Sequence, residues 1–169
     1  RQVPHILGSY RAYLDTCTSW DLIKNSTKLF VCFGGVPLKN GQICQGGTGN
    51  HYQKESIISA ASSGIEFVNV SPLKSDLMDE AGGKWLSLRP NTDTALMLGI
   101  AHTLHIEGLS DKDFLNKYTE GFDIFLNYLL GSNDGIQKNA NWAAEICDIS
   151  ANEIRELARR MVSNRTMIS

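Results

Sequence analysis

The sequence predicts an α/β fold in which helices cover both faces of a short parallel sheet. Three short apolar runs, at 28–34, 65–72 and 84–90, are each bounded by glycine or proline, as buried strands are. Helical patterns separate these runs, and the chain beyond residue 92 has helical periodicity throughout. Strands alternating with helices favour a right-handed βαβ succession, so we expect a three-layer, Rossmann-like domain with additional C-terminal helices.

The first half of the chain supplies the strands. After the run at 28–34, the glycine-rich stretch 39–50 predicts a flexible connection. A helix is expected from 50 to 64, and a polar helix over 74–81 follows the second strand, which ends at Ser71 and Pro72. The side chains expected to face the sheet from the first of these helices are Tyr52, Ile57, Ile58 and Ala61.

The second half supplies helices that act mainly as scaffold. They are expected over 93–107, after a capping pair of Ser110 and Asp113, within 121–131, at 141–147, and over 150–163, where Ser150 and Glu153 form a capping box. Their inward faces are predicted from helical spacing. These faces comprise Met97, Ile100, Ala101 and Leu104, then Phe114, Leu115 and Tyr118, then Phe122, Phe125, Leu126 and Leu129, and finally Ile154, Leu157, Ala158 and Met161.

Composition excludes several classes of function. With 169 residues, 42% hydrophobic and 20% charged, the chain suits one soluble domain spanning 1–169. The formal net charge is −2 and the basic residues are scattered, so nucleic acid is not an expected partner. No apolar stretch reaches the roughly 18 to 20 residues that a membrane span needs. The first residues lack a start methionine and a signal-peptide pattern, so the chain is expected to be cut at its beginning.

Cysteine and histidine offer no catalytic or metal site. Cys17, Cys32, Cys44 and Cys147 are widely spaced, without a Cys-x-x-Cys pair, and are interpreted as thiols that are mostly packed. His102 and His105 are three residues apart on a predicted helix, but no acid or cysteine nearby completes a ligand set. A Gly-x-Ser-x-Gly elbow, a Walker loop and a full Gly-x-Gly-x-x-Gly fingerprint are also missing from the sequence.

Polar turns follow each of the three predicted strands. The first turn is 34–39, the second 71–75 and the third 89–93. In parallel sheets, ligands bind outside the carboxyl ends of the strands. These turns offer a nucleotide glycines for close backbone approach, hydroxyls and helix N-terminal amides for phosphate oxygens, and one carboxylate for the guanine edge. The candidate cofactor-binding residues are Gly34, Gly35, Pro37, Lys39, Ser71, Pro72, Lys74, Ser75, Arg89, Pro90, Thr92 and Asp93.

Spacing alone leaves a plainer interpretation open for the same residues. Asp93 would then only cap a helix, Arg89 would pair with a surface acid, and the glycines would only turn the chain.

Two long stretches carry a family resemblance. "RPNTDTALMLGIAHTLHIEGLSDKDFLNKYTEGFDIFLNYLLG" and "DGIQKNANWAAEICDISANEIRELARRMV" resemble the bacterial molybdopterin guanine dinucleotide oxidoreductases, in the branch that reduces dimethyl sulfoxide, trimethylamine N-oxide and biotin sulfoxide. The resemblance covers nearly the whole chain. It implies one internal α/β domain of a larger enzyme that holds two such dinucleotides around molybdenum, in which the three turns bind one dinucleotide and Asp93 holds the guanine.

The resemblance also limits what this chain does alone. In the family, the serine that ligates molybdenum precedes the position matching "VPHILGSY", so the isolated chain is expected to be folded but inactive, without molybdenum. The remaining domains and an S-oxide or N-oxide substrate are the implied partners. The compartment, periplasmic or cytoplasmic, is left undetermined.

The sequence departs from the family pattern at two turns. Val36 and Ser71 precede proline where the family commonly has Asn or Asp, and Lys74 stands where Arg is frequent. These departures are expected to weaken two polar contacts. The stretch "GQICQGGTGNHY" is also unlike the commoner family members, which leaves the identity of the oxide open. The alternative function is a non-catalytic nucleotide-binding or regulatory module on the same fold. A serine-containing segment encoded just before Arg1 would favour the enzyme.

Overall fold

The fold is described from a computed structural model, which describes residues 4–5, 8–9, 11, 18–44, 47–48 and 50–169. Its centre is a four-stranded, fully parallel sheet in the order β5-β4-β1-β6. The strands are β1 (Leu29–Phe33), β4 (Glu66–Ser71), β5 (Lys84–Ser87) and β6 (Thr166–Ile168). The predicted α/β fold with a short parallel sheet is confirmed.

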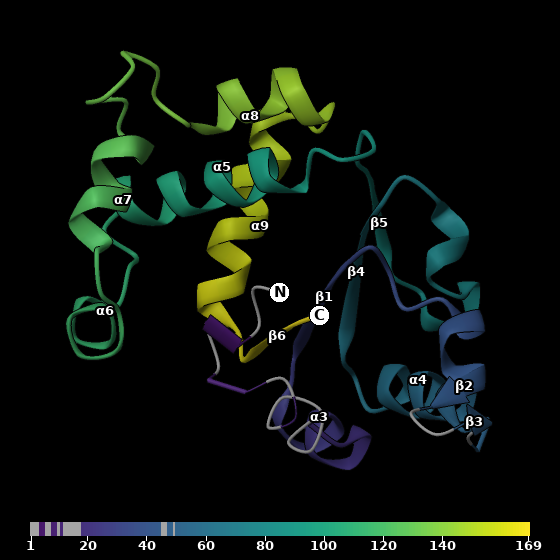
Figure 1. The fold of residues 1–169 in the computed structure, drawn as a ribbon. Helices are drawn as coiled ribbons and strands as arrows, with labels where there is room; N and C mark the ends of the chain where they lie inside the picture. The colour runs from purple at the N-terminus through teal and green to yellow at the C-terminus, as the bar shows by residue number, and fades with distance from the viewer. Residues whose placement is uncertain (1–3, 6–7, 10, 12–17, 45–46, 49) are drawn as a thin grey trace.

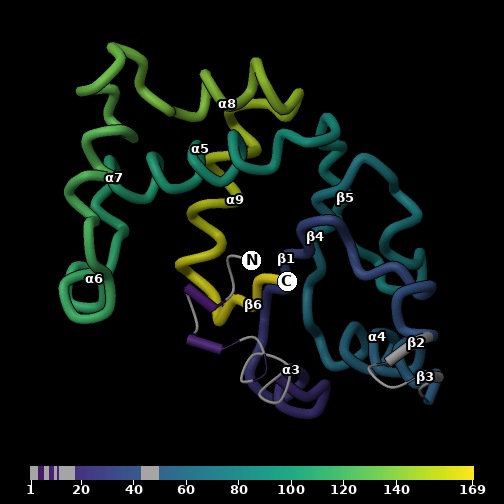
Figure 2. The backbone as a smooth tube through the Cα atoms, in the orientation of Figure 1, coloured from purple at the N-terminus to yellow at the C-terminus, as the bar shows by residue number. Residues whose placement is uncertain are grey.

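Helices cover both faces of the sheet (Figure 1). One face carries α3 (Trp20–Ser26) and α4 (Gln53–Ser62). The other carries α5 (Asp93–Ile106), α8 (Ala140–Cys147) and α9 (Ala151–Ser163), with α6 (Lys112–Tyr118) and α7 (Phe122–Leu129) beyond α5. The tube in Figure 2 follows the chain from β5 through this second group before it returns as β6 beside β1. The strand order is therefore the doubly wound one, with its switch point between β1 and β6.

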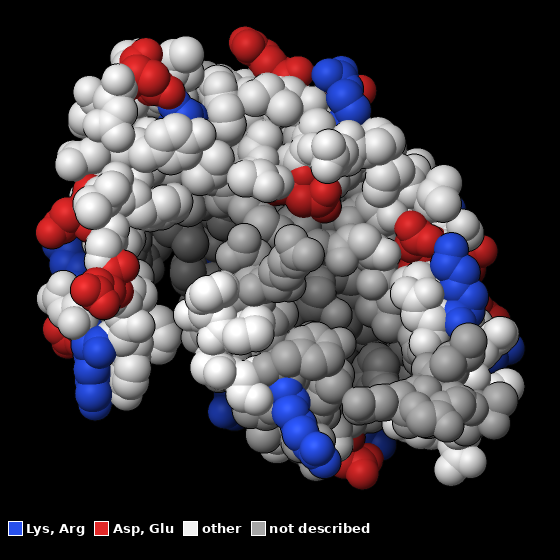
Figure 3. Space-filling model, in the orientation of Figure 1, with Lys and Arg blue, Asp and Glu red and all other residues white. Residues whose placement is uncertain are grey.

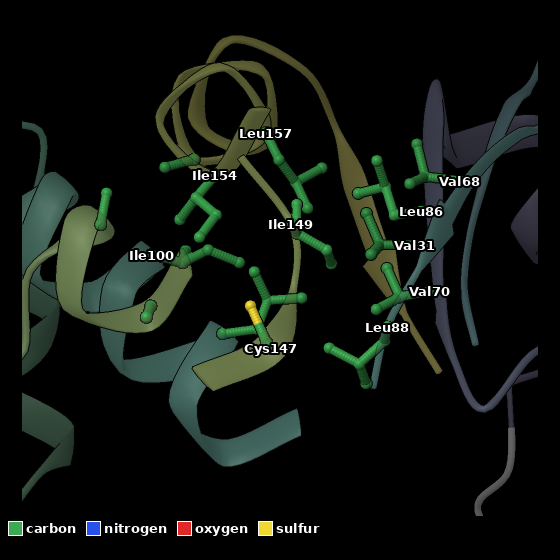
Figure 4. Close-up of a cluster of buried hydrophobic side chains, with 14 of the residues drawn as sticks. Val31, Val68, Val70, Leu86, Leu88, Ile100, Cys147, Ile149, Ile154 and Leu157 are labelled. Carbon is green, nitrogen blue, oxygen red and sulfur yellow. The ribbon is translucent and has the colours of Figure 1, made fainter. Parts of the chain in front are cut away.

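Each face of the sheet has its own apolar core because successive side chains of a strand point to opposite sides. In Figure 4, Val31, Val68 and Val70 face Ile154 and Leu157 from the helices. Phe30, Phe67 and Ile57 form the core on the α4 face. Burying two layers of this kind provides most of the driving force for folding.

The predicted strands are found with ends shifted by at most three residues, but the C-terminal strand β6 was missed. The expectation that the chain is wholly helical beyond residue 92 is wrong at Thr166–Ile168. Three residues are too few to show strand periodicity, and only pairing with β1 makes them a strand.

Two connections in the first half also differ from expectation. The glycine-rich stretch contains a 3₁₀ turn at Leu38–Gln42 and a two-residue hairpin of β2 (Ile43–Cys44) with β3 (Gly47–Thr48). The helix expected over 74–81 is replaced by 3₁₀ turns at Lys74–Asp76 and Asp79–Ala81.

The reason for the second difference lies in a strand residue. Asn69 Nδ2 donates to the carbonyl oxygens of Leu73 and Lys74, at 3.4 and 3.1 Å, and so competes for acceptors that an α-helix would use. Leu77 then adopts an extended backbone between the two turns and is buried in the core. Burial of Leu77 in the core therefore sets the path of this segment, which does not form an α-helix.

The predicted inward face of α5 is confirmed at Ile100, which is buried, and at Leu104, which packs against the core, but it is wrong at Met97, which is 44% exposed. Leu96, Gly99 and Thr103 also face inward. The helix is apolar nearly all round, so spacing in the sequence does not select one face. Gly99 selects it, because a Cβ atom there would lie 2.8 Å from the Cβ of Ala143 in α8.

Several other helix details also need correction. The N-cap of α6 is Asp111, which accepts a hydrogen bond from the Phe114 amide at 2.9 Å, and not Ser110. Tyr52 is exposed, as are three aromatic side chains expected to face inward from α6 and α7. These three are Phe114, Tyr118 and Phe125. The capping residue Ser150 and the buried face of α9 at Ile154, Leu157 and Ala158 are as predicted.

Candidate functional site

The three strand-end turns lie at the same edge of the sheet. They follow β1, β4 and β5, which are parallel and are in register at Phe33 with Val70 and at Ser71 with Ser87. The amide of Gly34 donates to the carbonyl of Val70 at 2.9 Å, so the first turn begins directly beside the end of β4. The turns predicted from separate parts of the sequence thus share the carboxyl edge, where α/β folds bind ligands.

The first and second turns are in direct contact. The amide of Val36 donates to the carbonyl of Asp76 at 2.7 Å. Gly35 has φ +74°, and its position leaves no room for a side chain because Asp76 packs against it. Gly34 has φ +78° with open space around it, so its backbone faces an unfilled region at this edge.

Ser71 shapes the second turn from within. It is fully buried, and its hydroxyl is hydrogen-bonded to the carboxylate of Asp76 and accepts from the amide of Leu73. Its carbonyl accepts from the indole Nε1 of Trp85 at 2.8 Å. The exposed residues Pro72, Lys74 and Ser75 form the outer surface of this turn.

The third turn leads from β5 into α5. Asn91 has a left-handed backbone with φ 64°, which asparagine tolerates better than most residues. The hydroxyl of Thr92 donates to the carbonyl of Arg89 at 2.7 Å, and Pro90 is exposed. Thr92 is the N-cap residue of α5, yet it makes no side-chain capping bond.

Asp93 occupies the first position of α5 and is half-buried. Its carboxylate makes no hydrogen bond or ion pair with any described residue, so it does not act as the helix cap that the plainer interpretation assigned to it. A carboxylate at a helix N-terminus is favoured by the helix dipole and has its acceptor sites free.

Arg89 follows the plainer interpretation more closely. Its guanidinium lies 3.9 Å from the carboxylate of Asp148, and both side chains are largely exposed. Its amide donates to the carbonyl of Cys147 at 3.0 Å, which attaches the third turn to the end of α8. Such an exposed pair contributes little to stability and leaves the guanidinium free to bind elsewhere.

The charged side chains near this edge do not form a continuous patch of one sign. Pro37 is half-buried, while Lys39 and Lys74 are exposed and form no ion pair within the described part of the chain. Figure 3 shows acidic and basic side chains interspersed on one face of the molecule, without a continuous basic patch on it. Each of these lysines is therefore available to bind a single anionic group, and the edge has no extended basic surface.

The cysteines that the structure describes in full are packed thiols. Cys32 and Cys147 are both free and buried, and burial raises the pKa of the Cys32 thiol to about 12. Burial also raises the pKa of Cys147. A protonated thiol is a poor nucleophile and ligand. Cys17 lies outside the described residues, and the side chain of Cys44 is likewise not described.

His102 is buried in α5, and its Nε2 atom has no hydrogen-bond partner among the described residues. Burial lowers its pKa, opposed by a side-chain hydrogen bond with Gln137. Within the described residues, no group of three or more His, Cys, Asp or Glu side chains is arranged to hold a metal ion. No helix in that same part of the chain is long and apolar enough to cross a membrane.

Sequence reasoning missed the residues that hold the turns in place. These are Asn69 and Asp76 in and after β4, and Gln53 of α4, whose Nε2 donates to the carbonyls of Val36 and Pro37 at 3.4 and 3.5 Å. Of these three residues, only Asn69 could have been identified from the sequence, because it is a polar residue inside an apolar strand.

Comparison with known proteins gives relatives over nearly the entire chain. It is 40% identical over 167 residues to a dimethyl sulfoxide/trimethylamine N-oxide reductase of Cereibacter sphaeroides, covering 99% of this chain and 20% of the relative. A trimethylamine-N-oxide reductase of Haemophilus influenzae is 40% identical over 169 residues, and a biotin sulfoxide reductase of Cereibacter sphaeroides is 38% identical over 165. These matches cover 98% of this chain in both cases and 20% and 22% of the relatives.

The chain thus spans about a fifth of the length of the relatives it matches. No protein-family model matches it. Among solved structures, the acetylene hydratase from Pelobacter acetylenicus has a similar fold, with a TM-score of 0.65 over 86% of this chain and 18% of the hydratase. At 22% identity, this likeness concerns the fold alone.

Proposed function

We infer that this chain, a homologue of one segment of the dimethyl sulfoxide/trimethylamine N-oxide and biotin sulfoxide reductases, is the α/β cofactor-binding domain of a larger molybdenum oxidoreductase. The proposed cofactor is molybdopterin guanine dinucleotide. The proposed reaction of the whole enzyme is reduction of an S-oxide or N-oxide. When bound, the cofactor supplies the oxygen-atom transfer chemistry, and this domain binds and orients the cofactor.

The observation that carries the proposal is the free carboxylate of Asp93 at the carboxyl edge of the sheet. A carboxylate accepts two N–H donors side by side, which is the donor pattern of the guanine edge. Because the Asp93 side chain makes no bond with any described residue, it would lose none of those partners on binding guanine. Its half-buried position would strengthen such contacts relative to a fully exposed acid.

The other strand-end residues fit a dinucleotide as well. The open space at Gly34 permits close backbone approach. Lys39 and Lys74, which form no ion pair with a described residue, offer ammonium groups to phosphate oxygens. Ser75 and Thr92 offer hydroxyls nearby. Ser71 and Gly35 are proposed to contribute indirectly, because contacts with Asp76 hold the first two turns together.

The decisive experiment replaces Asp93 by Asn in the full-length protein. The amide presents a donor to guanine donors, and losing a charge-assisted hydrogen bond costs about 1.5 to 3 kcal/mol, or roughly 10- to 100-fold in affinity. We expect molybdenum and guanine nucleotide content per protein to fall, together with reduction of dimethyl sulfoxide, trimethylamine N-oxide or biotin sulfoxide. The matched control is Asp111→Asn, an exposed cap of α6 away from the edge. Full cofactor content in Asp93→Asn would refute the assignment.

A further inference from the structure

An apolar groove separates α6 and α7 from the helices that cover the sheet. Figure 1 shows these two helices projecting beyond the end of α5, and Figure 3 shows the surface hollowed beside them. The groove has a volume of about 340 Å³ and is lined mainly by apolar side chains of α5, α6, α7 and α9, among them Leu104, Phe114, Phe125 and Val162. Its described lining residues all lie outside the three strand-end turns, so the groove is distinct from the proposed cofactor edge.

Large apolar side chains are exposed beyond the groove as well. Ile124 is 74% exposed and Tyr118 is 64% exposed, and neither lines the groove. Six of the eight residues of α7 are apolar or aromatic, and the other two are Asp123 and Asn127. Clustered apolar exposure of this kind marks an interaction surface. A small ligand in the groove would leave Ile124 and Tyr118 uncovered, so the surface fits a polypeptide partner better.

The two helices also lack buried contacts of their own. α6 has seven residues and none is buried, and Leu129 is the buried residue of the eight in α7. Isolated helices shorter than about 12 to 15 residues are marginal in water and depend on tertiary packing. The ring contacts of Phe114 with Tyr118 and of Phe122 with Phe125 stay within each helix. Packing against another segment would supply the burial that α6 and α7 lack.

The relatives indicate where such a segment comes from. They are about five times as long as this chain, and the matches cover 98 to 99% of it, so α6 and α7 lie within the matched part. In a polypeptide of that length, other domains are tethered to this one and meet it at a high effective concentration. Residues 111–123 carry four acidic and two basic side chains, which favours a partner with basic residues beside its apolar ones.

We propose that the groove, together with the exposed side chains of α6 and α7, is the docking surface for another segment of the same polypeptide. That segment fills the groove with aliphatic or aromatic side chains and carries basic residues at its edges. Burial of Phe114, Ile124 and Phe125 drives the docking. The proposal rests on the proposed place of this chain in a larger enzyme, but not on the cofactor or on Asp93. Cofactor content and docking are measured separately, so either proposal can fail alone.

The first test is photo-cross-linking in the full-length protein, with p-benzoylphenylalanine in place of Phe125. Mass spectrometry after irradiation identifies the peptide that this residue reaches. We expect an apolar peptide of the same polypeptide from outside the 169 residues. The matched control has the same cross-linker in place of Asn127, on the polar side of α7, and should give much less of that product. A product the size of two chains on a denaturing gel, cross-links only to peptides within the 169 residues, or no cross-link would each overturn the proposal.

The second test is hydrogen exchange in the full-length protein. Burial of one large apolar side chain changes a local opening equilibrium by about tenfold or more, so the amides of α6 and α7 should exchange at least about tenfold faster in Ile124→Ser. Asn127→Ser is the control on the same helix and should exchange like the unaltered protein. Because Ile124 is mostly exposed in this domain, equal exchange in the two variants would mean that nothing covers it. The cross-linking result decides the proposal if Ile124→Ser does not fold.

Discussion

Gly35 and Asp76 lie so close together that a Cβ atom at Gly35 would overlap the Cβ of Asp76. The glycine follows β1 and the aspartate follows β4, so this contact joins two of the strand-end turns. It also explains why the first turn needs a glycine at this position in addition to the positive φ of +74°.

Gly35→Ala should therefore destabilise the fold more than Gly34→Ala. Both residues have positive φ, which costs an alanine about 1 to 2 kcal/mol. Only position 35 adds a clash, with an overpacking cost of about 1 to 3 kcal/mol, because nothing lies within 4 Å of a Cβ at Gly34. Urea unfolding of both variants measures the difference. Equal losses would mean that the second turn moves aside without cost.

Asp93→Asn should change the free energy of unfolding of the chain by less than about 1 kcal/mol. The carboxylate makes no capping bond, so only its interaction with the helix dipole is lost. Asp111→Ala is the comparison, because Asp111 does cap α6 and its removal costs about 1 kcal/mol or more. Thermal or urea unfolding measures both. A larger loss in Asp93→Asn than in Asp111→Ala would make Asp93 a structural residue.

The Cys32 thiol should make stability fall at alkaline pH. Burial raises its pKa from 9.0 to about 12, so its contribution is complete below pH 9 and is lost as the pH rises toward 12. Between pH 7.5 and 10 the native chain should lose about 1 kcal/mol more than Cys32→Val, which has no titrating group. Urea unfolding at the two pH values gives the comparison. Parallel pH dependence in the two proteins would contradict it.

Lys138 should be important for stability although it is charged. It is 3% exposed, its ammonium lies over the ring of Tyr128, and it donates to the Asp134 carboxylate and the Ile136 carbonyl at 2.6 Å each. Lys138→Ala removes these contacts and should cost about 2 to 4 kcal/mol. Lys117→Ala on exposed α6 is the control and should cost less than about 1 kcal/mol. Unfolding curves that match for the two variants would show that the buried ammonium contributes nothing.

The candidate site was predictable to the extent that it depends on strand direction. Parallel strands place their following turns at one edge, so Gly34, Ser71 and Asp93 could be grouped without coordinates. Their individual roles could not be predicted. Whether a hydroxyl points outward or binds a neighbouring turn depends on contacts such as that of Ser71 with Asp76, which no local pattern encodes.

The sequence by itself determined the fold class, the three longer strands, and the helices that have a strong cap or a one-sided apolar stripe. These are local properties, because the runs around β1 and β4 and the Ser150 cap of α9 are complete within a few residues. Tertiary structure decided what local pattern left open. Pairing with β1 makes Thr166–Ile168 a strand, Gly99 against Ala143 sets the buried face of α5, and Asn69 prevents a helix after β4. In each case the deciding partner is distant in sequence or competes for the same backbone groups, so its effect exists only once the chain has packed.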